Sequence, residues 1–135
     1  MMSLNEKRPS VSGRRGFTLV EVMVVMAILV TILSIAVPFY TRAMIRAKES
    51  VLMSNLFTMR SVIDQYTYDK EEPPQALEDL VSEGYLRDVP MDPFTESRTT
   101  WEVITDTGPT GESGIFDVKS GSEDTALNGT PYGEW

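Results

Sequence analysis

The sequence predicts an α+β fold in which one long N-terminal α-helix packs on a small antiparallel β-sheet. Three observations lead to this prediction. An apolar run without any charge occupies residues 22–39. Apolar residues then recur at helical spacing between Ile45 and Tyr66. Finally, two short segments rich in β-branched and aromatic residues, 99–105 and 115–120, are separated by a glycine-rich stretch that is typical of a turn.

The composition narrows the range of functions. A chain of 135 residues fits one domain, and it contains no cysteine and no histidine. These absences remove disulfides, thiol nucleophiles, histidine-bearing zinc sites and the usual catalytic base, so we expect no enzymatic activity. Residues 17–135 carry nineteen acidic side chains against eight basic ones. Because such a surface repels phosphate groups, we expect no nucleic-acid partner.

The N-terminal part is interpreted as a leader followed by a membrane span. Residues 1–16 are polar and carry four basic side chains against one acidic, as expected of a cytoplasmic leader. Residues 22–39, as a helix, would extend about 27 Å, close to the hydrocarbon thickness of a bilayer. We expect the transmembrane part to cover about residues 17–41. Pro38 lacks an N–H group and should kink or loosen this helix.

An amphipathic helix is expected to continue beyond the membrane span. Its apolar positions are separated by steps of seven, four, three, four and three residues, which places them on one helical face. The two parts together predict one helix over residues 17–69, ended by the Glu-Glu-Pro-Pro sequence at 71–74. The residues on the apolar face are Ile45, Leu52, Leu56, Met59, Ile63 and Tyr66.

Residues 70–135 are expected to form a head outside the membrane. A short helix is predicted over residues 74–86, with a proline in its first turn and a glycine at its end. Residues 89–94 should be extended because each proline disfavours helical geometry at the residue before it. The two β-rich segments should form a hairpin facing the long helix. A C-terminal loop, 121–135, should be held to the head by its aromatic side chains.

One motif at the edge of the apolar run indicates the class of protein. Residues 14–21 read Arg-Arg-Gly-Phe-Thr-Leu-Val-Glu. This segment resembles the leader junction of the type IV pilin superfamily. The resemblance implies a pilin-like fold, cleavage after Gly16 by a prepilin peptidase, and N-methylation of Phe17 as the new N-terminus. Chemically, Gly16 leaves an open scissile bond, and the two arginines favour the cytoplasmic face.

Glu21 is the most informative single residue of this motif. A carboxylate inside a membrane helix is costly unless it is paired or protonated, and such groups usually mark function. The resemblance implies that Glu21 pairs with the Phe17 amine of a neighbouring subunit when helices, including the segment around Pro38, pack into a fibre. The alternative is that Glu21 lies at the cytoplasmic interface without any role in assembly.

Three segments of the head indicate a narrower class: Gly84-Tyr85-Leu86, residues 89–94 and Gly133-Glu134-Trp135. Through these segments the head resembles the major pseudopilin of the type II secretion system. It implies a calcium site in the loop after the sheet, and hard oxygen donors suit this ion. An acidic loop is also explained by a solvated surface that keeps the head soluble. The candidate calcium ligands are Ser122, Glu123, Asp124 and Asn128.

The expected function is that of a structural subunit of a periplasmic pseudopilus that drives protein export. Its partners would be identical subunits, minor pseudopilins, the prepilin peptidase and an inner-membrane assembly platform. The subunit would cross the inner membrane once, with its head in the periplasm. Three alternatives stay open: a surface type IV pilus subunit for adhesion or motility, a membrane-anchored binding module that does not polymerise, and a small anchored hydrolase. An ordinary signal peptide, cut after Ala36, is a further alternative.

Overall fold

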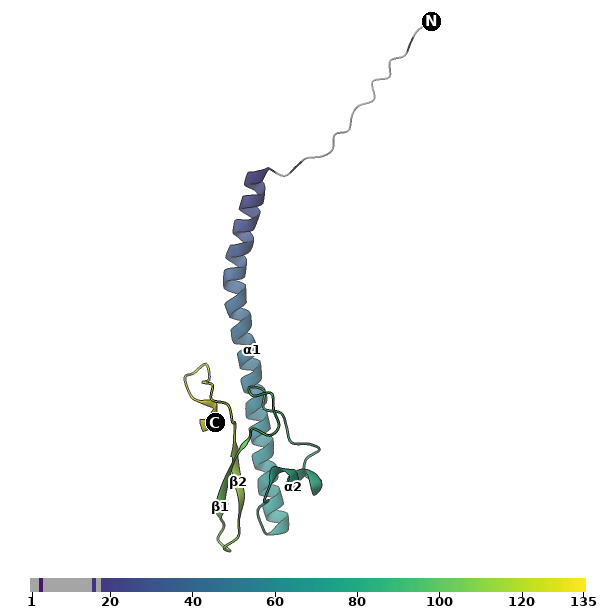
Figure 1. Cartoon of the computed structure of the whole chain (residues 1–135), viewed down its shortest axis with the longest axis vertical. Helices are drawn as coiled ribbons and strands as arrows, with labels where there is room; N and C mark the ends of the chain where they lie inside the picture. Colours follow the sequence, from purple (N-terminus) through teal and green to yellow (C-terminus); the bar gives the residue numbers. More distant parts are fainter. Residues whose placement is uncertain (1–2, 4–15, 17) are drawn as a thin grey trace. The chain divides into compact units, whose positions relative to one another are not determined.

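The computed structural model describes residue 3, residue 16 and residues 18–135. It divides into two compact units, Met1–Phe39 and Tyr40–Trp135, which are described separately below. Helix α1 (Leu19–Lys70) contributes to both units, and the remaining elements belong to the second. Figure 1 shows the α2 segment and the β1–β2 hairpin beside the C-terminal part of α1. The predicted α+β fold, with a long helix and a small antiparallel sheet, is confirmed.

Helix α1 is 52 residues long and ends one residue beyond the predicted boundary. Glu71, directly after its last residue, adopts a φ of 60°, a left-handed conformation that stops the helix. The two prolines at 73 and 74 then prevent any continuation. The helix is continuous through Pro38. The predicted kink at this proline stays a prediction.

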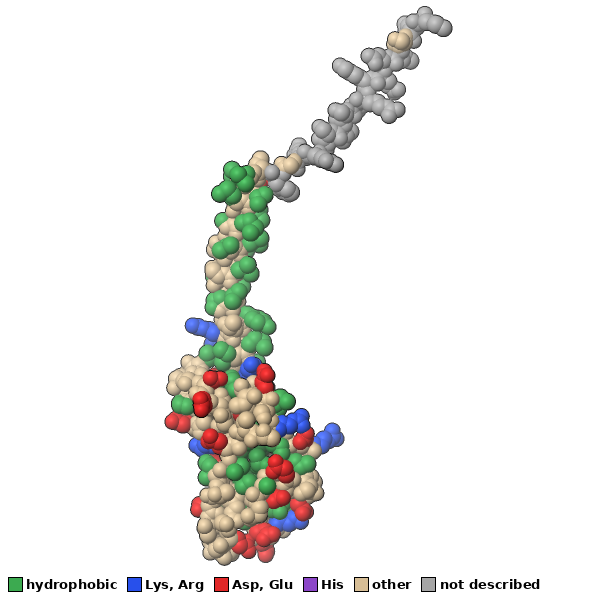
Figure 2. Space-filling model, in the orientation of Figure 1, with side chains coloured by type: hydrophobic (Ala, Val, Ile, Leu, Met, Phe, Trp, Pro, Cys, Tyr) green, Lys and Arg blue, Asp and Glu red, His purple; other side chains and the backbone are tan. Residues whose placement is uncertain are grey.

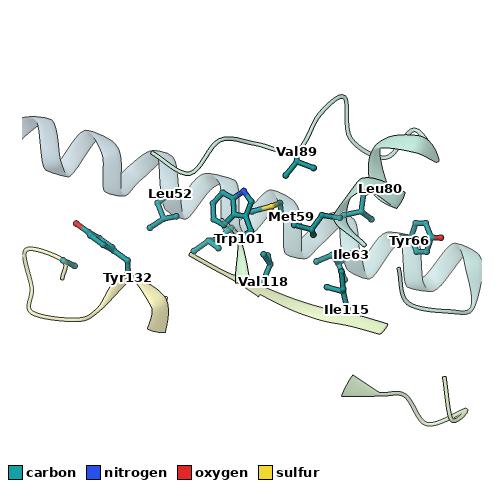
Figure 3. Close-up of a cluster of buried hydrophobic side chains, with 13 residues drawn as sticks. Leu52, Met59, Ile63, Tyr66, Leu80, Val89, Trp101, Ile115, Val118 and Tyr132 are labelled. Carbon is teal, nitrogen blue, oxygen red and sulfur yellow. The ribbon is translucent and has the colours of Figure 1, made fainter. Parts of the chain in front are cut away.

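The core of the second unit lies along one face of α1. Figure 3 shows Leu52, Met59 and Ile63 of the helix pointing toward residues of the hairpin and the loop before it. All five positions predicted between Leu52 and Tyr66 are buried, whereas Ile45 is only half-buried. Burial of these apolar side chains is the main force that holds the head on the helix. The partners across the core include Leu77, Leu80, Val89, Trp101, Ile115, Val118 and Tyr132.

The sheet is a two-stranded antiparallel hairpin of β1 (Glu102–Thr107) and β2 (Ser113–Lys119). Every residue of β1 is exposed, while β2 buries Ile115 and Val118 against the helix. The register shifts between Ile104 and Thr105, where β2 has one extra residue. This bulge places two buried residues three positions apart on one face, where a regular strand would place them two apart.

Both strands differ from their predicted bounds, which were 99–105 and 115–120. The first strand starts later than position 99 because Trp101 turns into the core, where its Nε1 donates to the carbonyl oxygen of Pro90 at 2.7 Å. Its side chain therefore packs under the hairpin without belonging to it. Both strands also extend closer to the turn than predicted: β1 ends at Thr107, and β2 begins at Ser113.

Two further predictions for the head were wrong in part. The short helix α2 covers only Leu77–Ser82. It begins later than Pro74 because Oδ2 of Asp79 accepts the N–H groups of Gln75 and Ala76, at 3.0 and 3.1 Å, and so caps the helix at that point. The segment at 89–94 is extended only as far as Asp92. There, a turn begins in which the N–H of Phe94 donates to Oδ1 of Asp92 at 2.9 Å.

Candidate functional site

The first turn of α1 carries the carboxylate that the motif singles out. The N–H of Glu21 donates to Oγ1 of Thr18 at 3.2 Å, so Thr18 occupies the N-cap position. The Glu21 side chain is exposed and makes no hydrogen bond or ion pair with other described residues. Gly16 is also exposed. Phe17 lies outside the described residues, so its predicted methylation stays a prediction.

The N-terminal half of α1 presents apolar side chains all around. Figure 2 shows mainly hydrophobic side chains over this part of the helix. Every residue from Thr18 to Met44 is exposed, and α1 is long and apolar enough to cross a membrane. The hydroxyls of Thr31 and Ser34 donate to the carbonyl oxygens of Ala27 and Thr31, at 2.8 and 2.7 Å. The helix therefore satisfies its own polar side chains here, as an apolar environment requires.

In the second unit, a groove of about 700 Å³ lies between α1 and the C-terminal loop. Met53 and Phe57 of α1 line it and are 60% and 72% exposed. Leu127 and Trp135 of the loop form the opposite wall. Such large exposed apolar side chains, grouped in one groove, are typical of a surface that contacts another molecule.

The four predicted calcium ligands all lie in the loop after β2. Glu123, Asp124 and Asn128 are exposed, and Ser122 is half-buried. Oδ1 of Asn128 accepts the N–H of Thr130 at 3.0 Å, and Oγ of Ser122 accepts the N–H of Asp124 at 3.2 Å. In the described part of the chain, no group of three acidic, histidine or cysteine residues could hold a metal ion. With two exposed carboxylates and two oxygens used in local turns, this set does not fit the six to eight oxygen ligands of calcium.

Two side chains of α1 that the sequence analysis did not single out hold this loop. Oε1 of Glu49 accepts the hydroxyl of Tyr132 at 2.9 Å and the N–H of Leu127 at 3.0 Å. Burial and the bond to Glu49 raise the pKa of the Tyr132 phenol above its usual value. Arg60 donates to the main-chain oxygen of Trp135 at 2.7 Å. The expectation that aromatic residues pin the loop to the head is therefore confirmed.

The sequence around Glu49 and Arg60 does not reveal which residues they bind. Their partners lie 57 to 83 positions further along the chain, so a pattern of neighbouring residues does not reveal them. A weak signal was present in their helical positions. Both are charged residues next to the apolar face, where a side chain can reach across to a segment packed on that face.

Comparison with known proteins agrees with the motif and with the fold. The family model for the prokaryotic N-terminal methylation motif matches residues 11–37. The type II secretion system core protein G of Pectobacterium carotovorum subsp. carotovorum is 30% identical over 135 residues, covering 85% of this chain and 84% of the relative. The protein of the same name from Escherichia coli K12 is 29% identical over 127 residues, covering 82% of this chain and 83% of the relative.

A more limited similarity connects the chain with a surface fimbria. The type IV major fimbrial protein FimA of Dichelobacter nodosus is 38% identical over 61 residues, which is 45% of this chain and 39% of the relative. No solved structure is significantly similar to the chain. The near full-length similarity, the methylation motif and the long helix with its small sheet together show that the chain belongs to the type II secretion system core protein G family.

Proposed function

We propose that this protein is the structural subunit of a periplasmic pseudopilus that drives protein export by type II secretion. The observation that carries the proposal is the similarity to core protein G over 85% of the chain. The exposed apolar half of α1 supports it, because a helix of this kind needs lipid or other apolar helices around it. The role of the subunit is structural, and it catalyses no reaction.

Assembly follows removal of the leader. The prepilin peptidase cuts after Gly16, and Phe17 becomes the methylated N-terminus of the mature subunit. The methylation motif at residues 11–37 supports this processing because it spans the cleavage point and most of the apolar segment. Gly16 itself is exposed and precedes the start of α1, which supports access by the peptidase.

Within the fibre, Glu21 pairs with the Phe17 amine of a neighbouring subunit. This role is supported by its free carboxylate, which makes no ion pair with other described residues, and by its position in an apolar helix. Pairing neutralises two charges that would be costly in an apolar fibre core, and it fixes the stagger between helices. Pro38 lies in the same packed segment and adapts the helix to its neighbours.

The subunit first crosses the inner membrane once, with its head in the periplasm, and then enters a homopolymer. Minor pseudopilins and an inner-membrane assembly platform, driven by a cytoplasmic ATPase, complete the set of protein partners. A surface type IV pilus is the second candidate. The similarity to the fimbrial protein of Dichelobacter nodosus favours it, but covers only 45% of this chain.

The test combines the mass of the N-terminal peptide with filament formation. Membranes are prepared from host cells with and without a functional prepilin peptidase, and sheared filament fractions are collected from the same cells. We expect a methylated Phe17 terminus that depends on the peptidase, and short filaments that require the other secretion components. An intact leader, or a terminus created by cleavage after Ala36, would contradict the proposal. Long surface filaments together with normal protein export in a deletion strain would favour the pilus.

A further inference from the structure

The C-terminal loop, residues 121–135, is fixed to α1 at two points. At the first point, a single oxygen, Oε1 of Glu49, accepts two hydrogen bonds from the loop. One comes from the N–H of Leu127 at 3.0 Å and the other from the hydroxyl of Tyr132 at 2.9 Å. A hydrogen bond to an ionised carboxylate is stronger than one between neutral groups. Glu49 thus holds the turn at residues 126–129 through Leu127 and the segment after it through Tyr132.

Arg60 provides the second point. Its Nη2 donates to the main-chain oxygens of Val118 and Trp135, at 3.1 and 2.7 Å, and its Nε donates to Asp117 at 2.7 Å. The guanidinium group therefore joins the end of β2 to the last turn of the loop. The two anchors are eleven positions apart on α1, or about 16 Å at the standard helical rise. The loop is held at separate points along the helix.

The loop also satisfies its own polar groups between these anchors. The N–H of Ala126 donates to the carbonyl oxygen of Thr130 at 2.8 Å, and the N–H of Tyr132 donates to that of Asp124 at 3.1 Å. The ring of Tyr132 stacks on Phe94 at a centroid distance of 3.9 Å and meets Trp135 edge-on at 5.1 Å. Tyr132 is only 1% exposed. Hydrogen bonds within the loop and aromatic contacts of Tyr132 thus hold this conformation, and both are made by protein groups alone.

We infer that Glu49 and Arg60 form a protein-only clamp that closes this loop without a bound metal ion. The clamp takes the place of the calcium site that the resemblance implied, because the oxygens proposed for that site at 122 and 128 serve local turns and the proposed ligand set contains only two carboxylates. The inference concerns folding of the head and is independent of whether the subunit polymerises.

The clamp also sets one wall of the apolar groove. Leu127 and Trp135 line the groove opposite Met53 and Phe57, and both belong to the clamped loop. Glu49 itself lines it as well. Opening the clamp would therefore remove a wall of the groove and loosen Tyr132 from the core, while the packing of α1 against β2 stays in place.

The test uses the full-length chain in detergent micelles. Hydrogen exchange of the peptide covering residues 121–135 reports on the loop, and the Tm reports on the head as a whole. Both are measured with a calcium chelator and with excess CaCl2. The variant Glu49→Ala removes both loop bonds, and Glu49→Gln keeps an acceptor oxygen in the same place. Asp64→Ala is the matched control, because Asp64 is an exposed acidic residue of α1 without a partner among the described residues.

We expect the wild-type protein to show the same loop exchange and the same Tm with chelator and with calcium. Glu49→Ala should raise loop exchange at least tenfold and lower the Tm by about 4–8 °C, as the loss of two bonds in a small domain implies. Glu49→Gln should restore most of the protection, and Asp64→Ala should match the wild type.

Two outcomes would overturn the inference. The first is a calcium-dependent gain in Tm or in loop protection, which would return the role to a metal site. The second is unchanged loop exchange in Glu49→Ala, which would remove Glu49 from the clamp. If Glu49→Ala fails to fold, Tyr132→Phe tests the clamp in its place, because it removes one hydrogen bond to Glu49 and keeps the aromatic ring that stacks on Phe94. Its loop exchange should rise, and an unchanged value would count against the clamp.

Discussion

Oδ2 of Asp92 accepts a hydrogen bond of 2.5 Å from the hydroxyl of Ser120, although the two residues are 28 positions apart in the sequence. Both side chains are buried, with 0% and 1% exposure. The other oxygen, Oδ1, accepts the N–H of Phe94 at 2.9 Å. One buried carboxylate thus joins the turn after the extended segment to the end of β2, where the C-terminal loop begins.

Asp92→Ala should therefore destabilise the head strongly. It would leave the buried Ser120 hydroxyl without an acceptor and the half-buried N–H of Phe94 without its partner, at a cost of about 2–4 kcal/mol in the free energy of unfolding. Asp92→Asn should cost less, because an amide can accept from Phe94 and donate to the Ser120 oxygen. Urea unfolding in detergent measures both. Equal free energies of unfolding for Asp92→Ala and the surface control Asp64→Ala would show that the buried pair of Asp92 and Ser120 is not important for stability.

The stability of the head should fall at high pH, partly through Tyr132. Burial and the bond to Glu49 raise the pKa of this phenol above its usual value near 10. At a pH well below the usual pKa, the phenol stays protonated in both the folded and the unfolded state, so Tyr132 adds no pH dependence to the free energy of unfolding. Above it the unfolded phenol ionises first, so the free energy of unfolding falls with rising pH, by up to about 1.4 kcal/mol per unit for each such group.

The measurement compares unfolding free energies between pH 9 and pH 11 in three proteins. Tyr132→Phe should be less stable at neutral pH but show a shallower alkaline slope than the wild type. Tyr68→Phe is the matched control, because Tyr68 is 82% exposed, and it should keep the wild-type slope. Identical slopes in Tyr132→Phe and in the wild type would contradict the assignment.

Glu21→Ala should abolish fibre formation while leaving the leader cleavable. The reason is that the proposed pair with the Phe17 amine would be lost, leaving that amine unpaired in an apolar core. We expect a decrease of about tenfold or more in sheared filaments, with a normal amount of methylated subunit in the membrane. Asp64→Ala serves as the control for a lost carboxylate. Wild-type filament yield in Glu21→Ala would support the interfacial location of Glu21 instead.

Gly16→Leu should block processing without disturbing the described structure. A Cβ atom added at Gly16 meets no atom of the described residues within 4 Å, so they leave space for a larger side chain. A loss of cleavage would then result from the peptidase, whose access to the peptide bond depends on a small residue. The mass of the N-terminal peptide should show an intact leader in this variant. Normal cleavage at position 16 would remove Gly16 from the processing signal.

The long helix was predictable because its signal is local and repeated. Five buried positions from Leu52 to Tyr66 follow helical spacing, and the prolines after Glu71 mark the end. Periodicity of this kind needs no knowledge of what the helix packs against. The fold class follows directly, because a hairpin predicted after such a helix has few ways to pack other than against the apolar face of the helix.

The errors occurred where a distant or competing contact decides the geometry. The start of α2 depends on which N–H groups Asp79 caps, and a proline in the sequence gave the wrong starting point. The first strand was misplaced because Trp101 packs inward and bonds to Pro90. The anchors of the C-terminal loop pair residues more than fifty positions apart, so the pattern of a single sequence does not contain them.

Under the proposed function, the exposed apolar half of α1 also determines how subunits are supplied for growth. Because the segment at residues 22–39 is without charge and its large side chains are each 47% exposed or more, free subunits would aggregate in water. The reservoir of subunits would then be two-dimensional, confined to the plane of the bilayer. Elongation should depend on the number of subunits per unit area of membrane, and lateral diffusion in lipid should set its upper limit.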